Sequence, residues 1–163
     1  METDIRKRIE YALIKRLGVK GCKNVEIDKI DSLQERRYMV PVGDIVDYMT
    51  FDRKGEISCY VIITNKDELF YNKNYPLHGH RNCFVMPEEL FNEVNEKRDF
   101  LELVGRDTGV MILNDKDELL RGFACSRVEL APWKATLLLE CFARATARET
   151  AKLYELEYNN ETT

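Results

Sequence analysis

Residues 57–64, "ISCYVIIT", constrain the fold of this chain more than any other stretch. The run is almost continuously apolar and rich in β-branched residues, a pattern typical of a strand that is covered on both faces. Gly55, within "DRKGE", predicts a turn before this strand, and "NKDELFYNKN" predicts a turn or a short helix after it. Because such a strand needs a packed layer on either side, we expect a sheet between helices.

The flanking segments supply these layers. Apolar residues recur at helical spacing over residues 4–17, and residues 132–157, opened by Pro132, predict a longer helix with an alanine-rich face. Strands are predicted over 24–30, 38–51, 82–86, 109–114 and 119–130, and a short helix over 87–94. This order predicts an α/β (α+β) fold, in which one mixed sheet has flanking helices and a long C-terminal helix.

Length and composition fit one globular domain. The chain has 163 residues, of which 44% are hydrophobic and 33% charged, enough for a single core. We expect one domain over residues 1–157 and a frayed tail over 158–163. No apolar run is long enough to cross a membrane and the start "METDIRKRIE" is too polar for a signal peptide, which predicts a cytoplasmic protein without membrane contact. Five cysteines without CxxC spacing argue against a disulfide framework.

The charge is unevenly distributed. A net charge of −4 argues against a protein that grips nucleic acid by overall electrostatics, because phosphate binding depends on neutralisation by lysine and arginine. Residues 1–23 nevertheless hold seven basic side chains against three acidic ones. The candidate nucleic-acid-binding residues in this segment are Lys7, Arg8, Lys15 and Arg16. The alternative is that they form an ordinary solvated helix surface.

The order of elements resembles the PD-(D/E)XK nuclease-like superfamily and, within it, the MmcB-like DNA-repair proteins. The matching segments lie in residues 40–155: "GDIVDYMTFDRKGE", "VIITNKDELF", "HRNCFVMPEELF", "GRDTGVMILND" and "CFARATARETAKL". The resemblance implies a restriction-endonuclease-like core. It also implies a catalytic site made of an acid on one strand and an E-x-K motif on the next, which together hold a divalent metal and activate a water.

That catalytic motif is degenerate in this chain. Asp44 matches the first acid, but Tyr60 stands where the glutamate belongs and Ile62 where the lysine belongs. Mg²⁺ requires hard oxygen ligands, and a phosphoryl transition state requires a nearby cation. The three positions are therefore vestigial, and neither cleavage nor a bound metal is expected.

A relocated site is the alternative. The groups that such a site would recruit are Glu10, Lys66, Asp67 and Lys73, and only in that case would Mg²⁺ be a cofactor. Asp47 is separated from Asp44 by an odd number of residues, so on a regular strand the two carboxylates point to opposite faces.

The segment "LHGHRNC" offers a second constellation. His78, His80 and Cys83 are ligand types that zinc accepts, but no fourth ligand is evident, and we expect a turn that leads into a strand. Trp133 opens the last helix, and we expect it to anchor that helix in the core instead of stacking on bases.

These observations favour a catalytically inactive nuclease-fold protein that acts as a DNA-associated or DNA-repair-related module. The alternative is a protein-interaction module, for example one encoded by a phage or mobile element, that modulates a host or defence enzyme. An active nuclease with a relocated site is the third possibility. The partner is thus nucleic acid or another protein.

Overall fold

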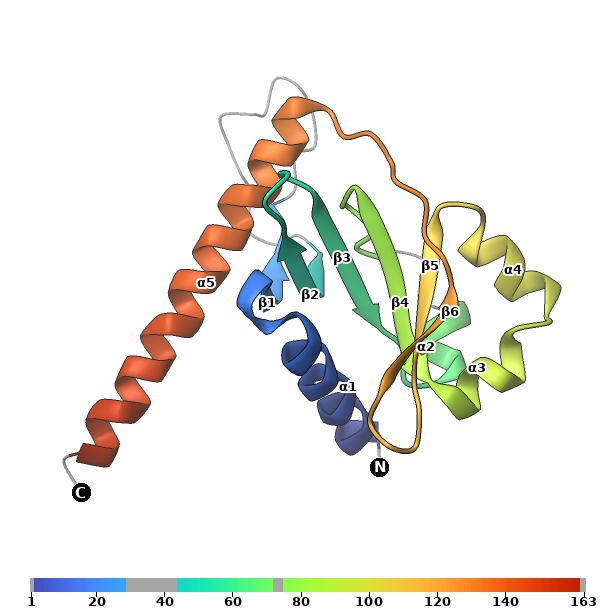
Figure 1. The fold of residues 1–163 in the computed structure, drawn as a ribbon, viewed down its shortest axis with the longest axis horizontal. Helices are drawn as coiled ribbons and strands as arrows, with labels where there is room; N and C mark the ends of the chain where they lie inside the picture. Colours follow the sequence, from blue (N-terminus) through green and yellow to red (C-terminus); the bar gives the residue numbers. More distant parts are fainter. Residues whose placement is uncertain (1, 29–43, 72–74, 162–163) are drawn as a thin grey trace.

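The structure is a computed structural model that describes residues 2–28, 44–71 and 75–161. Its helices and strands follow one another in this order: α1 (Glu2–Leu17), the 3₁₀ helix η1 (Gly18–Lys20), β1 (Gly21–Glu26), β2 (Ile45–Phe51), β3 (Ile57–Ile62), α2 (Lys66–Tyr71), β4 (Arg81–Pro87), α3 (Glu88–Val94), α4 (Arg98–Val104), β5 (Thr108–Leu113), β6 (Leu119–Phe123) and α5 (Pro132–Glu161). Figure 1 shows this arrangement.

The six strands form one mixed sheet in the order β1-β2-β3-β4-β5-β6. The first three strands are an antiparallel meander, β3, β4 and β5 run parallel, and β6 returns antiparallel to β5. The predicted buried strand is β3, in the interior of the sheet, which confirms the expectation drawn from residues 57–64. The predicted mixed α/β class is also confirmed.

Helices cover both faces of this sheet. On one face α1 packs on the side chains that neighbouring strands direct toward it, including Tyr48 of β2, Ile62 of β3 and Val85 of β4. On the other face α5 packs on β1, β2 and the start of β3, while α2, α3 and α4 cover β4 and β5. Figure 1 shows that α5 continues well past the edge of the sheet, so that its C-terminal end stands clear of the other elements.

Local signals explain most element boundaries. The turn between β2 and β3 is closed by the Asp52 carboxylate, which accepts hydrogen bonds from the backbone N–H groups of Lys54 and Glu56. Gly55 has φ of +79°, a conformation that costs glycine little, so the predicted turn is confirmed.

Three expectations need correction. Helix α4 was not predicted, although its Phe100 and Val104 are buried against the sheet. Strand β6 ends at Phe123, well before residue 130, and a bulge at Gly122 shifts its register against β5. Trp133 is 45% exposed and does not anchor α5 in the core, a task that Leu137 and Leu138 perform.

Residues 38–43 of the strand expected over 38–51, and the loop before it, lie outside the described residues, whereas residues 45–51 form β2 as predicted. Helix α5 runs to Glu161, beyond the expected end at residue 157. Within the described ranges, no helix has both the length and the apolar character that a membrane span requires.

Candidate functional site

The degenerate motif predicts that Asp44 lies beside Tyr60 and Ile62, but the structure separates them. The Asp44 carboxylate lies 3.0 Å from His78 Nε2 and lines a hollow with residues of α5 such as Trp133 and Leu137. Tyr60 and Ile62 instead belong to the cluster beneath α1, on the opposite face of the sheet. Strands β2 and β3 are adjacent, as expected, but the three vestigial positions do not form one site.

Asp47, and not Asp44, contacts the end of β3. Backbone pairing between β2 and β3 stops at Tyr48 and Tyr60, so the N–H of Ile62 has no strand partner on that side. The Asp47 carboxylate accepts this N–H at 2.7 Å, while its other oxygen lies 3.0 Å from the Arg6 guanidinium. Asp47 therefore caps the end of the central strand.

Arg6 joins this acid to another. Its guanidinium also lies 3.1 Å from Glu68 Oε1 in the first turn of α2, and donates to the Ile62 carbonyl at 3.3 Å. Glu68 in turn accepts hydrogen bonds from the N–H and hydroxyl groups of Thr64. We call Arg6, Asp47 and Glu68 the Arg6 network; it brings together two carboxylates at the end of β3.

The electrostatics of the Arg6 network oppose a metal ion. Burial raises the pKa of the Asp47 carboxyl, against the lowering effects of its hydrogen bond from Ile62 and of Arg6, and the charge of Glu10 raises it further. The space between the two carboxylates is filled by a guanidinium, which no cation can share. Among the described residues, no cluster of three acidic, histidine or cysteine side chains could hold a metal. The donor set here does not fit Mg²⁺.

The other candidates for a relocated site do not converge on the Arg6 network. Lys66 forms an ion pair with Glu93 of α3, and Asp67 is exposed. Lys73 lies outside the described residues. Only Glu10, through its charge, acts on Asp47.

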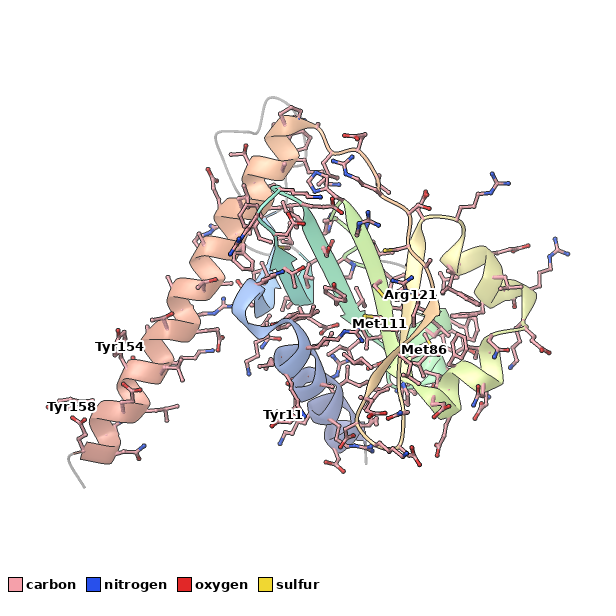
Figure 2. All side chains as sticks on the ribbon, in the orientation of Figure 1. Tyr11, Met86, Met111, Arg121, Tyr154 and Tyr158 are labelled. Carbon is pink, nitrogen blue, oxygen red and sulfur yellow. The ribbon has the colours of Figure 1, made fainter. Side chains whose placement is uncertain are left out.

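A hollow of about 440 Å³ opens on the α1 face, over the first halves of the parallel strands. Helix α1 covers the later halves of these strands, which leaves Tyr60, Cys83 and Met111 as the floor. Arginines from three separate elements stand around it: Arg16 at the end of α1, Arg81 at the start of β4 and Arg121 on β6. We call this site the arginine hollow; Figure 2 labels Met111 and Arg121.

The three arginines are engaged to different degrees. Arg81 forms an ion pair with Glu56, and Arg16 donates a hydrogen bond to the Leu119 carbonyl at 2.5 Å. Arg121 is exposed and makes no hydrogen bond or ion pair with the part of the chain that the structure describes. Two of the three guanidiniums thus have no carboxylate partner among residues 2–28, 44–71 and 75–161.

The floor of the arginine hollow presents neutral groups. Burial raises the pKa of Tyr60, and burial raises the pKa of the Cys83 thiol to about 12. At neutral pH the phenol therefore keeps its proton and can donate a hydrogen bond to an anion. Arginine forks around such a donor suit a phosphate or carboxylate group.

The predicted basic residues of α1 separate into two groups. Lys7 and Lys15 are exposed and share one side of the helix with Tyr11 and Ile14. Arg8 forms a 2.7 Å ion pair with Asp117, while Arg16 contributes to the arginine hollow.

A second hollow, of about 720 Å³, opens at the other end of the parallel strands. Its charged lining consists of Asp4, Arg8, Glu88, Glu89 and Asp115. We call it the acidic hollow.

The histidine and cysteine constellation is also divided. His78 contacts Asp44, whereas the Nδ1 atom of buried His80 accepts the backbone N–H of Ile57 at 3.0 Å. Cys83 lies on the floor of the arginine hollow. The three side chains serve separate structural contacts.

Sequence reasoning missed Arg6, Arg81 and Arg121. These residues come from three elements distant in sequence, and each stands in a segment where a single arginine is unremarkable. The only available signal was the excess of basic residues in 1–23, which identified Arg16.

No family model matches this chain, and no curated protein matches it. Its structure is similar to that of the SPO1766 protein of unknown function from Silicibacter pomeroyi, with a TM-score of 0.53 and 21% sequence identity. The similarity covers 71% of this chain and 74% of the other. At this identity the likeness shows a shared fold: a six-stranded mixed sheet with flanking helices.

Proposed function

We propose that this protein is a nuclease-like module that has lost catalysis and binds nucleic acid through the arginine hollow, acting in the cytoplasm as a DNA-associated or repair-related protein. The observation that carries the proposal is that Arg16, Arg81 and Arg121, from three separate elements, line one hollow together with Tyr60.

The chain order supports the nuclease-like part of the proposal. Helix α1, the antiparallel meander β1-β2-β3, helix α2 and the parallel strand β4 follow one another as the resemblance to PD-(D/E)XK proteins requires. Loss of catalysis is supported by the separation of Asp44 from Tyr60 and Ile62, and by the guanidinium of Arg6 between the two nearest carboxylates.

The arginine hollow supports the nucleic-acid part. Sequence-independent binding relies on basic groups that neutralise phosphates, and planar guanidiniums bind phosphate oxygens in pairs. The exposed lysines of α1, Lys7 and Lys15, extend this basic surface beyond the hollow. Tyr11, between them on the same side of α1, offers a ring on which an unpaired base can stack.

Each alternative has a different distinguishing feature. A protein-interaction module is favoured by the exposed leucines and tyrosines near the end of α5. An active nuclease with a relocated site needs free carboxylates, which the Arg6 network does not offer.

Titration of labelled duplex and single-stranded DNA at several salt concentrations tests the proposal. Three neutralised phosphates predict that the logarithm of the duplex association constant falls with that of salt concentration at a slope of about −3. Arg121→Ser should reduce the magnitude of this slope by about 1.

The matched control is Arg98→Ser on α4, because Arg98 is exposed and its only ion pair among the described residues is with Glu102. This variant should bind like the wild type. Absence of salt-dependent binding, or equal losses in the two variants, would contradict the proposal and favour a protein partner.

A further inference from the structure

The outward side of α5 carries an exposed row of small and aromatic residues. Spacings of four, four, three and four residues place Ala143, Ala147, Ala151, Tyr154 and Tyr158 on one side of the helix. All five are exposed, and the row lies opposite the side on which Leu138, Cys141 and Ala145 contact the sheet. Figure 2 shows Tyr154 and Tyr158 pointing away from the rest of the molecule. We call these five residues the outer row.

The second half of α5 is exposed to solvent. Every residue from Thr150 to Glu161 is exposed, and α5 makes its main contacts with β1 through its earlier turns. A helical segment of this length is marginal in water without a packing partner. Tyr154 and Tyr158, at 68% and 69% exposure, are the largest side chains left uncovered there.

We propose that a second copy of this chain covers the outer row, with the two α5 helices packed antiparallel about a twofold axis at Ala151. The row is self-complementary in this orientation, because its first half is small and its second half is large. Residues equally far before and after Ala151 then face each other, so Tyr154 packs over Ala147 of the partner. Tyr158 fits between the partner's Ala143 and the partner's Ala147.

The charges beside the outer row are also complementary. Arg144 and Arg148 flank its first half, and Glu155 flanks the same side of its second half. In the antiparallel pair Glu155 lies between the two arginines of the other copy, as an additional carboxylate beside the pairs that Arg144 forms with Asp28 and Arg148 with Glu26. A parallel pair would instead leave the alanines of the two copies facing each other across a gap.

The other exposed apolar side chains of this segment, Leu153 and Leu156, do not suit this partner. Leu156 continues the row of Ala145, Glu149 and Lys152, which faces the sheet side of α5. A second helix that packed along the whole of that side would meet β1 at the earlier turns of α5. The outer row, by contrast, is accessible along its whole length.

The surface involved is sufficient for a modest dimer. A tyrosine has about 150–250 Å² to bury, and Tyr154 and Tyr158 are 68% and 69% exposed, so the four tyrosines of a dimer remove at most roughly 400–700 Å² from water. With the alanines and flanking residues, the total approaches the roughly 1,200 Å² lower bound of specific interfaces. The dimer is therefore expected to dissociate on dilution. This inference goes beyond the proposed function and does not depend on it.

Sedimentation equilibrium of the full chain over about 1–500 µM tests the proposal. The wild type should pass from monomer to dimer in this range, and Tyr154→Asp with Tyr158→Asp should weaken association at least tenfold. The matched control is Leu153→Asp with Leu156→Asp, since each leucine is 60% exposed in the same turns. A monomer at all concentrations, or equal weakening by both pairs of changes, would overturn the proposal.

Cysteine trapping tests the orientation. In a Cys125→Ser background, which removes the only cysteine that is not buried, Ala151→Cys should form a disulfide-linked dimer under mild oxidation. Tyr158→Cys should not, because residue 158 lies far from its counterpart in an antiparallel pair. Efficient trapping through residue 158 would indicate a parallel pair and contradict the proposed geometry. Circular dichroism of each variant verifies that α5 remains helical.

Discussion

The arginine hollow and the acidic hollow lie at opposite ends of the parallel strands, and they differ in why their charges are there. Glu88 and Glu89 occupy the first turn of α3, where the helix dipole favours negative charge, so the fold itself accounts for them. Arg121 caps no helix, closes no turn and has no acidic partner among the described residues. Charge that the fold does not require is the better indicator of a ligand, and a net charge of −4 conceals it.

The largest expected difference, relative to the enzymes that the chain resembles, is that this protein does not cleave nucleic acid. Incubation of the pure protein with single- and double-stranded nucleic acid and Mg²⁺ or Mn²⁺ should give no cleavage. The rate enhancement of metal-dependent nucleases spans many orders of magnitude and requires a metal ion held by free carboxylates. Electrophoresis of the substrates measures the extent of cleavage.

Asp44→Ala and Asp47→Asn are the controls for that experiment. Cleavage lost in Asp47→Asn would mean that the acidic end of the strands is a working site. Such a result would reverse the comparison between the hollows.

Charge reversal in the arginine hollow should give the next largest effect. Arg16→Glu with Arg121→Glu should weaken DNA binding at least tenfold at low salt, since two phosphate contacts are replaced by repulsion. At physiological ionic strength, neutralising the acidic hollow by Glu88→Gln with Glu89→Gln should change affinity less than about twofold, because charges beyond the Debye length of about 8 Å are screened. Fluorescence anisotropy compares the three proteins, and comparable shifts from both hollows would remove the distinction.

Removal of Arg6 should destabilise the protein by about 1–3 kcal/mol, because Asp47 would remain half-buried without its cation. Above the pKa of Asp47 this cost applies in full. As pH falls through that pKa, which burial already raises, the carboxyl takes up a proton and the deficit of Arg6→Met should shrink.

Urea unfolding at neutral pH and near pH 4 measures the change, with Arg98→Met as the exposed control. A deficit that is independent of pH would show that Arg6 acts through packing alone.

The smallest expected effects are changes in the free energy of unfolding, which distinguish charged side chains that stabilise the fold from those that bind a ligand. Glu88→Gln and Glu89→Gln should each lower the free energy of unfolding by about 0.3–1 kcal/mol through loss of the helix-dipole interaction. Arg121→Ser should leave it unchanged within about 0.5 kcal/mol. Thermal and urea unfolding of the three variants provide the values; a clear loss in Arg121→Ser would assign that arginine a structural task.

Most of the fold could be predicted because its signals are local. The apolar run of β3, the spacing in α1 and the turn at Gly55 each depend on neighbouring residues alone. Helix α4 escaped prediction because it has only seven residues, two of them fully apolar and buried, too few to establish a period. The exposure of Trp133 depends on the packing of α5 on the sheet, in which Leu137 and Leu138 take the core positions, and no local pattern specifies it.

The site could be predicted only in part. Asp44 lies directly before β2, within the segment predicted as a strand. The face of the sheet on which its side chain lies was not predicted, because this end of the segment stays bonded to β1, through the hydrogen bond from Ile27 N–H to the Asp44 carbonyl, and departs from β3. The role of Asp47 depends on that departure. The arginine hollow combines residues 16, 81 and 121, whose proximity arises only from the sheet order.

The contact between α5 and β1 also bears on aggregation. Edge strands present unpaired backbone groups that can recruit another chain. Here β1 is interrupted at Asn24, whose φ is +52°, and the Asn24 carbonyl accepts a 2.6 Å hydrogen bond from Arg148. The opposite edge, β6, has only five residues and a bulge. Both edges are therefore poor templates for fibril growth, and Arg148 protects one of them from a position on the surface.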